Sequence, residues 1–140
     1  MAVNVVLPQS VKTFYARARN QKNELQSFAN SEPLFTSTDL PNGGLVKSIT
    51  AVPTIGVAQA TQLQIYRSKN NGTDLTIADT AVMPAYTYSP NAAVPKIEFS
   101  YTSTKPMRLA PGETLHVGIG VSNGSGSSGG IAFIVEIEAY

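Results

Sequence analysis

The segment from Thr114 to Tyr140 constrains the fold of this chain more strongly than any other. Residues 114–121 alternate apolar with small or polar side chains, and residues 131–139 do the same apart from Ala132 and Ile134. Alternation with a period of two places one face of a strand in a core and the other face in solvent. The residues between them, 122–130, are all Ser, Asn or Gly. The pattern therefore predicts two antiparallel strands joined as a hairpin with a long Gly/Ser tip.

Shorter strands are predicted along the rest of the chain. In residues 60–67 the alternation places Leu63 and Ile65 toward the core and Gln62, Gln64 and Tyr66 away from it. Gly-rich turns at residues 42–44 and 71–72 and prolines at 84, 90 and 95 separate the strands. The further predicted strands are 33–38, 45–52, 75–82, 96–101 and 106–109. About eight to ten short strands at even spacing predict an all-β fold, a β-sandwich of jelly-roll type.

The first 32 residues differ from the rest, and we predict an extended N-terminal arm at 1–32 followed by one sandwich domain at 33–140. Lys12, Arg17, Arg19 and Lys22 all precede the first acidic residue, Glu24. Two local structures remain open for this arm. Residues 14–19 fit a strand with both arginines on one face, whereas residues 16–28 are rich in helix-forming residues, with Leu25 and Phe28 three apart.

The composition excludes several classes of protein. Charged residues make up 14% of the chain, against about 25% in typical globular proteins, and such a surface favours a domain packed among neighbours. The chain has no cysteine and therefore no disulfide or thiolate chemistry. No secretory signal or membrane-spanning run is recognisable, so we expect synthesis in a cytoplasm and no membrane partner.

The residues suited to catalysis are few. The predicted hairpin would set the single histidine, His116, across from Glu136 and Thr114 across from Glu138 on the outward face, which is an ordinary cross-strand polar arrangement. One histidine and one carboxylate cannot complete a zinc site. Glu136 and Glu138 point the same way, so they do not form a glycosidase pair. We predict no catalytic residues, no metal and no cofactor, and hence no enzyme.

Nucleic acid is not a predicted partner. Outside the basic N-terminal segment the chain is slightly acidic, and a few charges without a folded basic platform bind phosphates weakly. An acidic protein surface is the expected partner of the arm. Tyr86 and Tyr88 lie in a predicted loop and could form a sugar-stacking platform, although core or interface positions are the ordinary use of such tyrosines.

Residues Gly44–Tyr140 resemble small virion proteins of tailed bacteriophages. The matching order is the strand GGLVKSITA, the hairpin LQIYRSKNNGTDLTI, the strand IEFSY, the segment KPMRLAPGETLHVGIGV and the closing GGIAFIVEIEAY. Residues 1–43 are not covered, and the resemblance is one of pattern. It implies a non-enzymatic structural protein of the particle, closest to the capsid decoration (cement) proteins, which are small β-sandwiches that are often trimeric.

From this resemblance we expect a location on the capsid surface of the virion, with the major capsid protein and further copies of the chain as partners. The arm would supply the partner-binding residues, which are Lys12, Phe14, Tyr15, Arg17, Arg19 and Lys22. Basic side chains there would complement acidic grooves on capsid subunits. The alternative is a tail, baseplate or fibre-tip module that binds a host surface glycan through Tyr86 and Tyr88.

Overall fold

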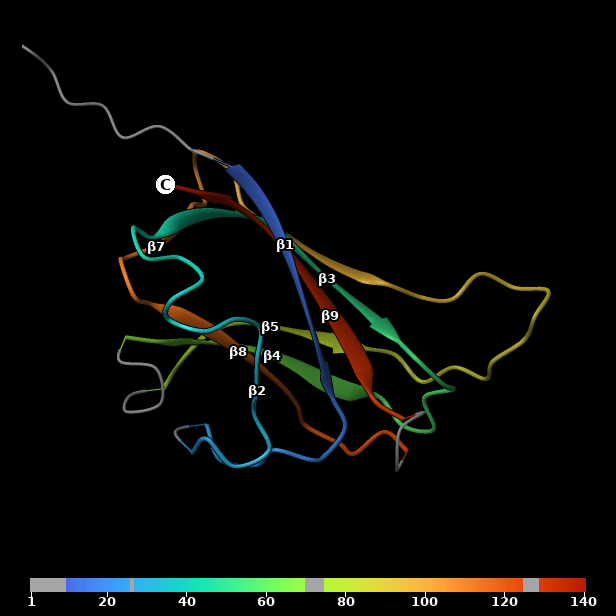
Figure 1. The fold of residues 1–140 in the computed structure, drawn as a ribbon. Coiled ribbons are helices and arrows are strands. Elements are labelled where there is room, and N and C mark those ends of the chain that lie inside the picture. The colour runs from blue at the N-terminus through green and yellow to red at the C-terminus, as the bar shows by residue number, and fades with distance from the viewer. Residues whose placement is uncertain (1–9, 26, 70–74, 125–128) are drawn as a thin grey trace, which may run out of the picture.

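The computed structural model describes residues 10–25, 27–69, 75–124 and 129–140, and it confirms the predicted all-β sandwich (Figure 1). Within these residues there is no helix, and hence none that could cross a membrane. The strands are β1 (Ser10–Ala18), β2 (Glu32–Pro33), β3 (Gly44–Pro53), β4 (Thr61–Ser68), β5 (Thr76–Met83), β6 (Ile97–Ser100), β7 (Met107–Leu109), β8 (Thr114–Ile119) and β9 (Ile131–Ala139).

The strands form two antiparallel sheets. The larger sheet has the order β1-β9-β3-β6, and β7 pairs with β3 beside β6. The smaller sheet has the order β2-β8-β4-β5. The prolines at 84, 90 and 95 stand outside the strands, as predicted. The strand predicted at residues 33–38 is reduced to the two residues of β2, after which Leu34 and Phe35 turn into the core.

The predicted hairpin of residues 114–121 and 131–139 is wrong. These segments form β8 and β9, which lie in different sheets and do not pair. His116 lies opposite Tyr66 and Pro33, and Glu136 lies opposite Thr13 and Ser48. Alternation shows which face of a strand is buried but not which strand lies beside it. The connection between the two strands crosses from one sheet to the other, which an adjacent pair would not require.

The core lies between the sheets and is built from the inward positions of both. Leu63, Ile65, Val117 and Ile119 come from the smaller sheet, and the odd-numbered residues of β9 come from the larger one. Ile97, Phe99 and Tyr101 also face inward, as predicted. Burial of these alternating side chains is the main force that holds the two sheets together.

The N-terminal region is part of the body from residue 10 onward. Residues 10–18 form β1, which pairs with β9 along its whole length, so the strand alternative is confirmed and the helix over 16–28 is wrong. Residues 21–25 and 27–31, which we call the strap, then lie along the outer side of the smaller sheet. The strap joins β8 through the amide of Lys22, which donates to the Ile119 carbonyl at 2.8 Å. Residues 1–9 of the predicted arm lie outside the described residues.

Candidate interaction surface

Strand β1 is the edge of the larger sheet, and its side chains divide cleanly between two faces. Lys12, Phe14 and Ala16 point toward the body. Val11 and Tyr15 point outward with 68% and 70% of their surface exposed. Among the described residues these are the two most exposed large hydrophobic side chains. The two side chains share the outward face of β1, with Thr13 between them, and together offer apolar surface that a partner could cover.

The other sheet edges are protected against pairing with a further strand. β2 has two residues and ends in a proline, and β6 has four residues and an external ion pair between Lys96 and Glu98. β5 carries a register irregularity opposite Ile65 and Tyr66 and turns the charged Asp79 inward. Short strands, irregularities and inward charges are the usual ways to block an edge. β1 has nine residues, and its one inward charge, Lys12, lies near its start.

The six predicted partner-binding residues fall into separate groups. Lys12 and Phe14 secure β1 to the body, because the Lys12 ammonium donates to the Asp39 carbonyl at 3.0 Å and the Phe14 ring lies 5.1 Å from that of Phe35. Tyr15 points outward. The sequence also contained a signal for Val11, since it shares the outward face of the same alternation, but that residue was not among the predicted ones.

Arg17 and Arg19 share one end of β1, as the strand interpretation predicted. A Cβ atom added at Gly130 would lie 2.9 Å from Cγ of Arg17 and 2.8 Å from Cγ of Arg19. Gly130 has a φ of 106°, which glycine adopts without strain. The glycine thus leaves room for both arginine stems. Neither guanidinium forms an ion pair with another described residue.

Lys22, the sixth predicted residue, is buried with 3% of its surface exposed. Its aliphatic stem crosses Gly118, where an added Cβ would lie 3.0 Å from Cδ of the lysine. Its ammonium lies 5.1 Å from the centre of the Tyr66 ring and donates to the strap carbonyls of Glu24 and Ser27. Burial lowers the pKa of Lys22, and the charge of Glu24 opposes that shift. The residue fastens the strap and presents no charge to a partner.

The strap buries the outer face of the smaller sheet. Gln64 and Tyr66 lie on the predicted side of β4, away from the core, yet both are buried. The Tyr66 hydroxyl donates to Gln64 Oε1 at 2.5 Å, and Gln64 Nε2 donates to the Lys22 carbonyl at 3.3 Å. Burial raises the pKa of Tyr66 to about 12. The outward positions of β4 thus form a small polar core beneath the strap.

His116 belongs to this second core and is not the exposed residue that was predicted. Only 6% of its surface is exposed, and its ring makes a T-shaped contact with the Phe28 ring of the strap, with 5.2 Å between the ring centres. Its Nε2 lies 3.4 Å from Thr114 Oγ1, and its Nδ1 is buried without a partner among the described residues. Burial, assisted by the charge of Lys22, lowers the pKa of His116, so the neutral ring is favoured.

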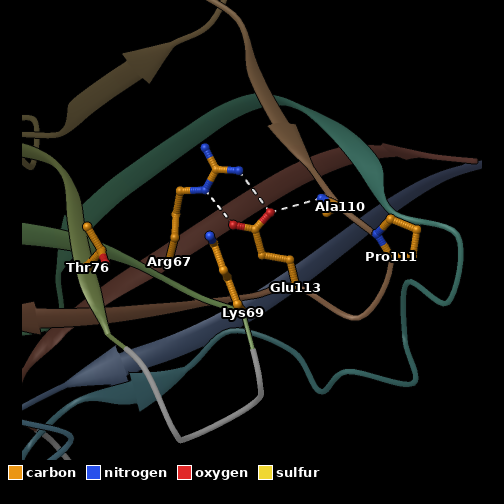
Figure 2. A pocket seen from close by; sticks show the side chains of 6 residues that line it. All are labelled: Arg67, Lys69, Thr76, Ala110, Pro111 and Glu113. Carbon is orange, nitrogen blue, oxygen red and sulfur yellow. Dashed lines mark hydrogen bonds and ion pairs between the residues drawn. The ribbon is translucent and has the colours of Figure 1, made fainter.

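A pocket of about 620 Å³ lies beside the Arg67–Glu113 pair (Figure 2). Arg67 Nε and Nη2 donate to the two oxygens of Glu113 at 2.7 and 2.8 Å, and the Ala110 amide donates to Oε1 at 2.9 Å. Burial alone would raise the pKa of Glu113, but these hydrogen bonds outweigh it and the pKa is lowered. Arg67 Nη2 also reaches the Arg108 carbonyl at 2.5 Å. Sequence reasoning missed this pair, which ties β4 to the 110–113 turn.

The remaining candidates lie apart. Tyr86 is half-buried, packs against the core and exchanges backbone hydrogen bonds with Val57, whereas Tyr88 is 60% exposed. The two rings therefore do not form a shared platform. No group of three His, Asp or Glu side chains in the described part of the chain could hold a metal ion.

No protein-family model matches this chain, and no curated protein sequence is similar to it.

Proposed function

We propose that the protein is a structural component of a tailed-phage particle, a capsid decoration protein that binds and stabilises the assembled shell. The observation that carries the proposal is the outward face of β1, where Val11 and Tyr15 are both more than two-thirds exposed on an unprotected edge strand. The resemblance of residues 44–140 to small virion proteins supports the location in the particle. The protein acts by contact and not by turnover.

The architecture suits a rigid bridging element. The Arg67–Glu113 pair and its bond to the Arg108 carbonyl link the smaller sheet to β7 of the larger one. The hydroxyl of Tyr101, the residue that follows β6, donates to Asp79 of β5 and so links the two sheets. A rigid body loses little conformational entropy when it binds. A ligand that binds only the assembled lattice then stabilises it by mass action.

The test uses capsids purified from phage particles that lack this protein. Purified wild-type chain is expected to sediment with these capsids. Val11→Lys and Tyr15→Ser should weaken binding at least about tenfold, because central apolar contacts carry most of an interface's affinity. Val82→Lys and Tyr88→Ser are matched controls, since these residues are 61% and 60% exposed elsewhere on the body.

Point variants are preferable to a truncation in this experiment. Deletion of residues 1–22 would remove β1 and the buried Lys22 together, and the loss of binding would then report unfolding. Deletion of residues 1–9 leaves every described strand intact and tests the predicted arm separately. Wild-type chain that never sediments with the capsids, or β1 variants that bind as well as the controls, would overturn the proposal.

Self-association is part of the proposal, with a homotrimer as the expected form. The low charged fraction of 14% supports burial of surface between copies. Sedimentation equilibrium of the full chain measures the state directly. A monomer at all concentrations, both free and in capsid extracts, would remove the oligomer from the proposal.

A tail module that binds host glycan is the second candidate, and the exposed ring of Tyr88 supports it. A single aromatic face can stack on one sugar ring. A glycan array measures this directly, with Tyr88→Ala as the variant. Binding that the variant abolishes would favour the tail module over the decoration protein.

A further inference from the structure

One side of β1 pairs with no other strand among the described residues. β1 pairs with β9 on one side, and no described backbone group outside β9 bonds to it. In a strand, alternate N–H and C=O groups point to opposite sides. About half of the backbone groups of β1 therefore point away from β9, where a further strand could bond to them.

The charge along β1 constrains what can occupy this edge. Residues 10–19 contain Lys12, Arg17 and Arg19 and no acidic residue, and the first acid of the chain is Glu24. Opposite Arg17 in the neighbouring strand stands Ala132, and the nearest carboxylate of β9, Glu136, stands opposite Thr13. The basic end of β1 thus has no acidic partner in its own sheet.

This charge pattern disfavours a second copy of the chain at the edge. In an antiparallel pair, two β1 strands would each place the end with Arg17 and Arg19 beside the end with Lys12 in the other strand, and neither strand holds an acid to neutralise them. Like charges across strands destabilise a pair. A different protein with acidic residues has no such penalty.

We propose that β1 accepts an extended segment of a partner protein as an added antiparallel strand. Acidic side chains near the start of the segment face Arg17 and Arg19, and uncharged side chains lie beside Tyr15 and Val11. The proposed antiparallel direction matches that of the named strand pairs in both sheets. The proposal rests on the proposed function for the identity of the partner, a neighbouring subunit of the particle.

The probe is a synthetic peptide of about nine residues, the length of β1. It has Asp and Glu at its first and third positions, which share one face of a strand, and uncharged Val and Thr at the others. Its binding to the full chain is followed by amide chemical shifts and amide hydrogen exchange. The expected result is shift changes and slowed exchange within residues 10–18. A peptide of the same composition with the acids at the C-terminus should bind at least about fivefold more weakly, since the charges no longer meet.

Two modifications separate strand addition from a simple charge contact. N-methylation of every second peptide amide blocks main-chain bonds on one side of the strand. One of the two methylation registers should abolish binding while the other leaves it nearly unchanged. The double variant Arg17→Glu/Arg19→Glu should weaken binding about tenfold or more, and Arg108→Glu, an exposed arginine on β7, should change it less than about twofold.

The results distinguish strand addition at β1 from capsid binding as such. Equal binding of both methylated peptides, or binding that the Arg17→Glu/Arg19→Glu variant retains, would overturn the added strand. Absence of any peptide binding would do the same. Capsid binding that depends on Val11 and Tyr15 but not on the two arginines would leave the proposed function standing without this inference. Peptide binding in a protein that never binds capsids would leave the inference standing without the function.

Discussion

Lys22→Ala is the perturbation that tests the strap most directly. The substitution removes about three buried methylene groups, at about 0.8 kcal/mol each. It also removes the contact of the ammonium with Tyr66, which lies 5.1 Å away, and the bonds to the Glu24 and Ser27 carbonyls. A cation–π contact contributes about 0.5–2 kcal/mol. Part of that loss is offset because the variant no longer buries a charged group, the same burial that lowers the pKa of Lys22. The expected loss in free energy of unfolding is about 3 kcal/mol.

Lys22→Met separates the stem from the charge. The methionine keeps most of the apolar packing on Gly118 but leaves the two strap carbonyls without their donor. Unmade hydrogen bonds of this kind cost about 1–2 kcal/mol in total. The loss in the free energy of global unfolding cannot exceed the free energy that holds the strap closed. A larger perturbation opens the strap while the sandwich stays folded.

The assay combines urea unfolding with amide hydrogen exchange. Both variants should be less stable than the wild type, and Lys22→Ala should lose more stability than Lys22→Met. Amide exchange should accelerate first at the strap and at β8. Lys96→Ala is the matched control, because Lys96 is exposed and forms only a surface ion pair with Glu98. It should change stability by less than about 0.5 kcal/mol. A Lys22→Ala protein as stable as this control, with unchanged exchange at β8, would refute the role of Lys22 as the strap's fastener.

Three further predictions follow from the same contacts. The pKa of His116 in the folded protein lies below 6.5, so its contribution to stability is complete above about pH 6.5 and is lost as the pH falls from there toward the folded pKa. His116→Gln should remove this dependence of the unfolding free energy on pH, measured by urea titrations between about pH 7.5 and 5. Glu113→Gln should cost about 1–2 kcal/mol at pH 7 and progressively less as the pH falls through the lowered folded pKa of Glu113, because the wild-type carboxylate loses its charge there; a cost that does not change with pH would contradict it. Gly118→Val should push the Lys22 stem and Gln64 outward and destabilise the protein by about 1–3 kcal/mol in thermal unfolding, whereas an unchanged melting temperature would contradict the close packing.

Much of the fold could be predicted because local rules act within a few residues. The alternation in 60–67 and 96–101 identified inward side chains correctly, since the period of two is a property of a strand itself. The turn at 42–44 was equally local, and Gly43 adopts the positive φ of 78° that the Asn-Gly-Gly sequence favours. These residues carry their structural preferences regardless of what lies beside them.

The candidate surface could be predicted only in part. The strand interpretation of residues 14–19 correctly placed Arg17 and Arg19 together, and Tyr15 proved exposed. Lys22 was grouped with them because four basic residues occur before any acid. No local pattern shows that a lysine stem will cross a glycine on another strand. Its burial follows from a contact with Gly118, which lies about 96 positions further along the chain.

The sequence by itself determined that the chain forms short strands with one apolar face, separated by glycine and proline turns. The tertiary structure decided which strands are neighbours: β8 and β9 pack in opposite sheets although their sequences read as a hairpin. It also decided that Tyr66 and His116, on an outward face, are covered by the strap. The physical reason is that periodicity reports burial of a face, whereas strand order and coverage depend on the total free energy of all long-range contacts together.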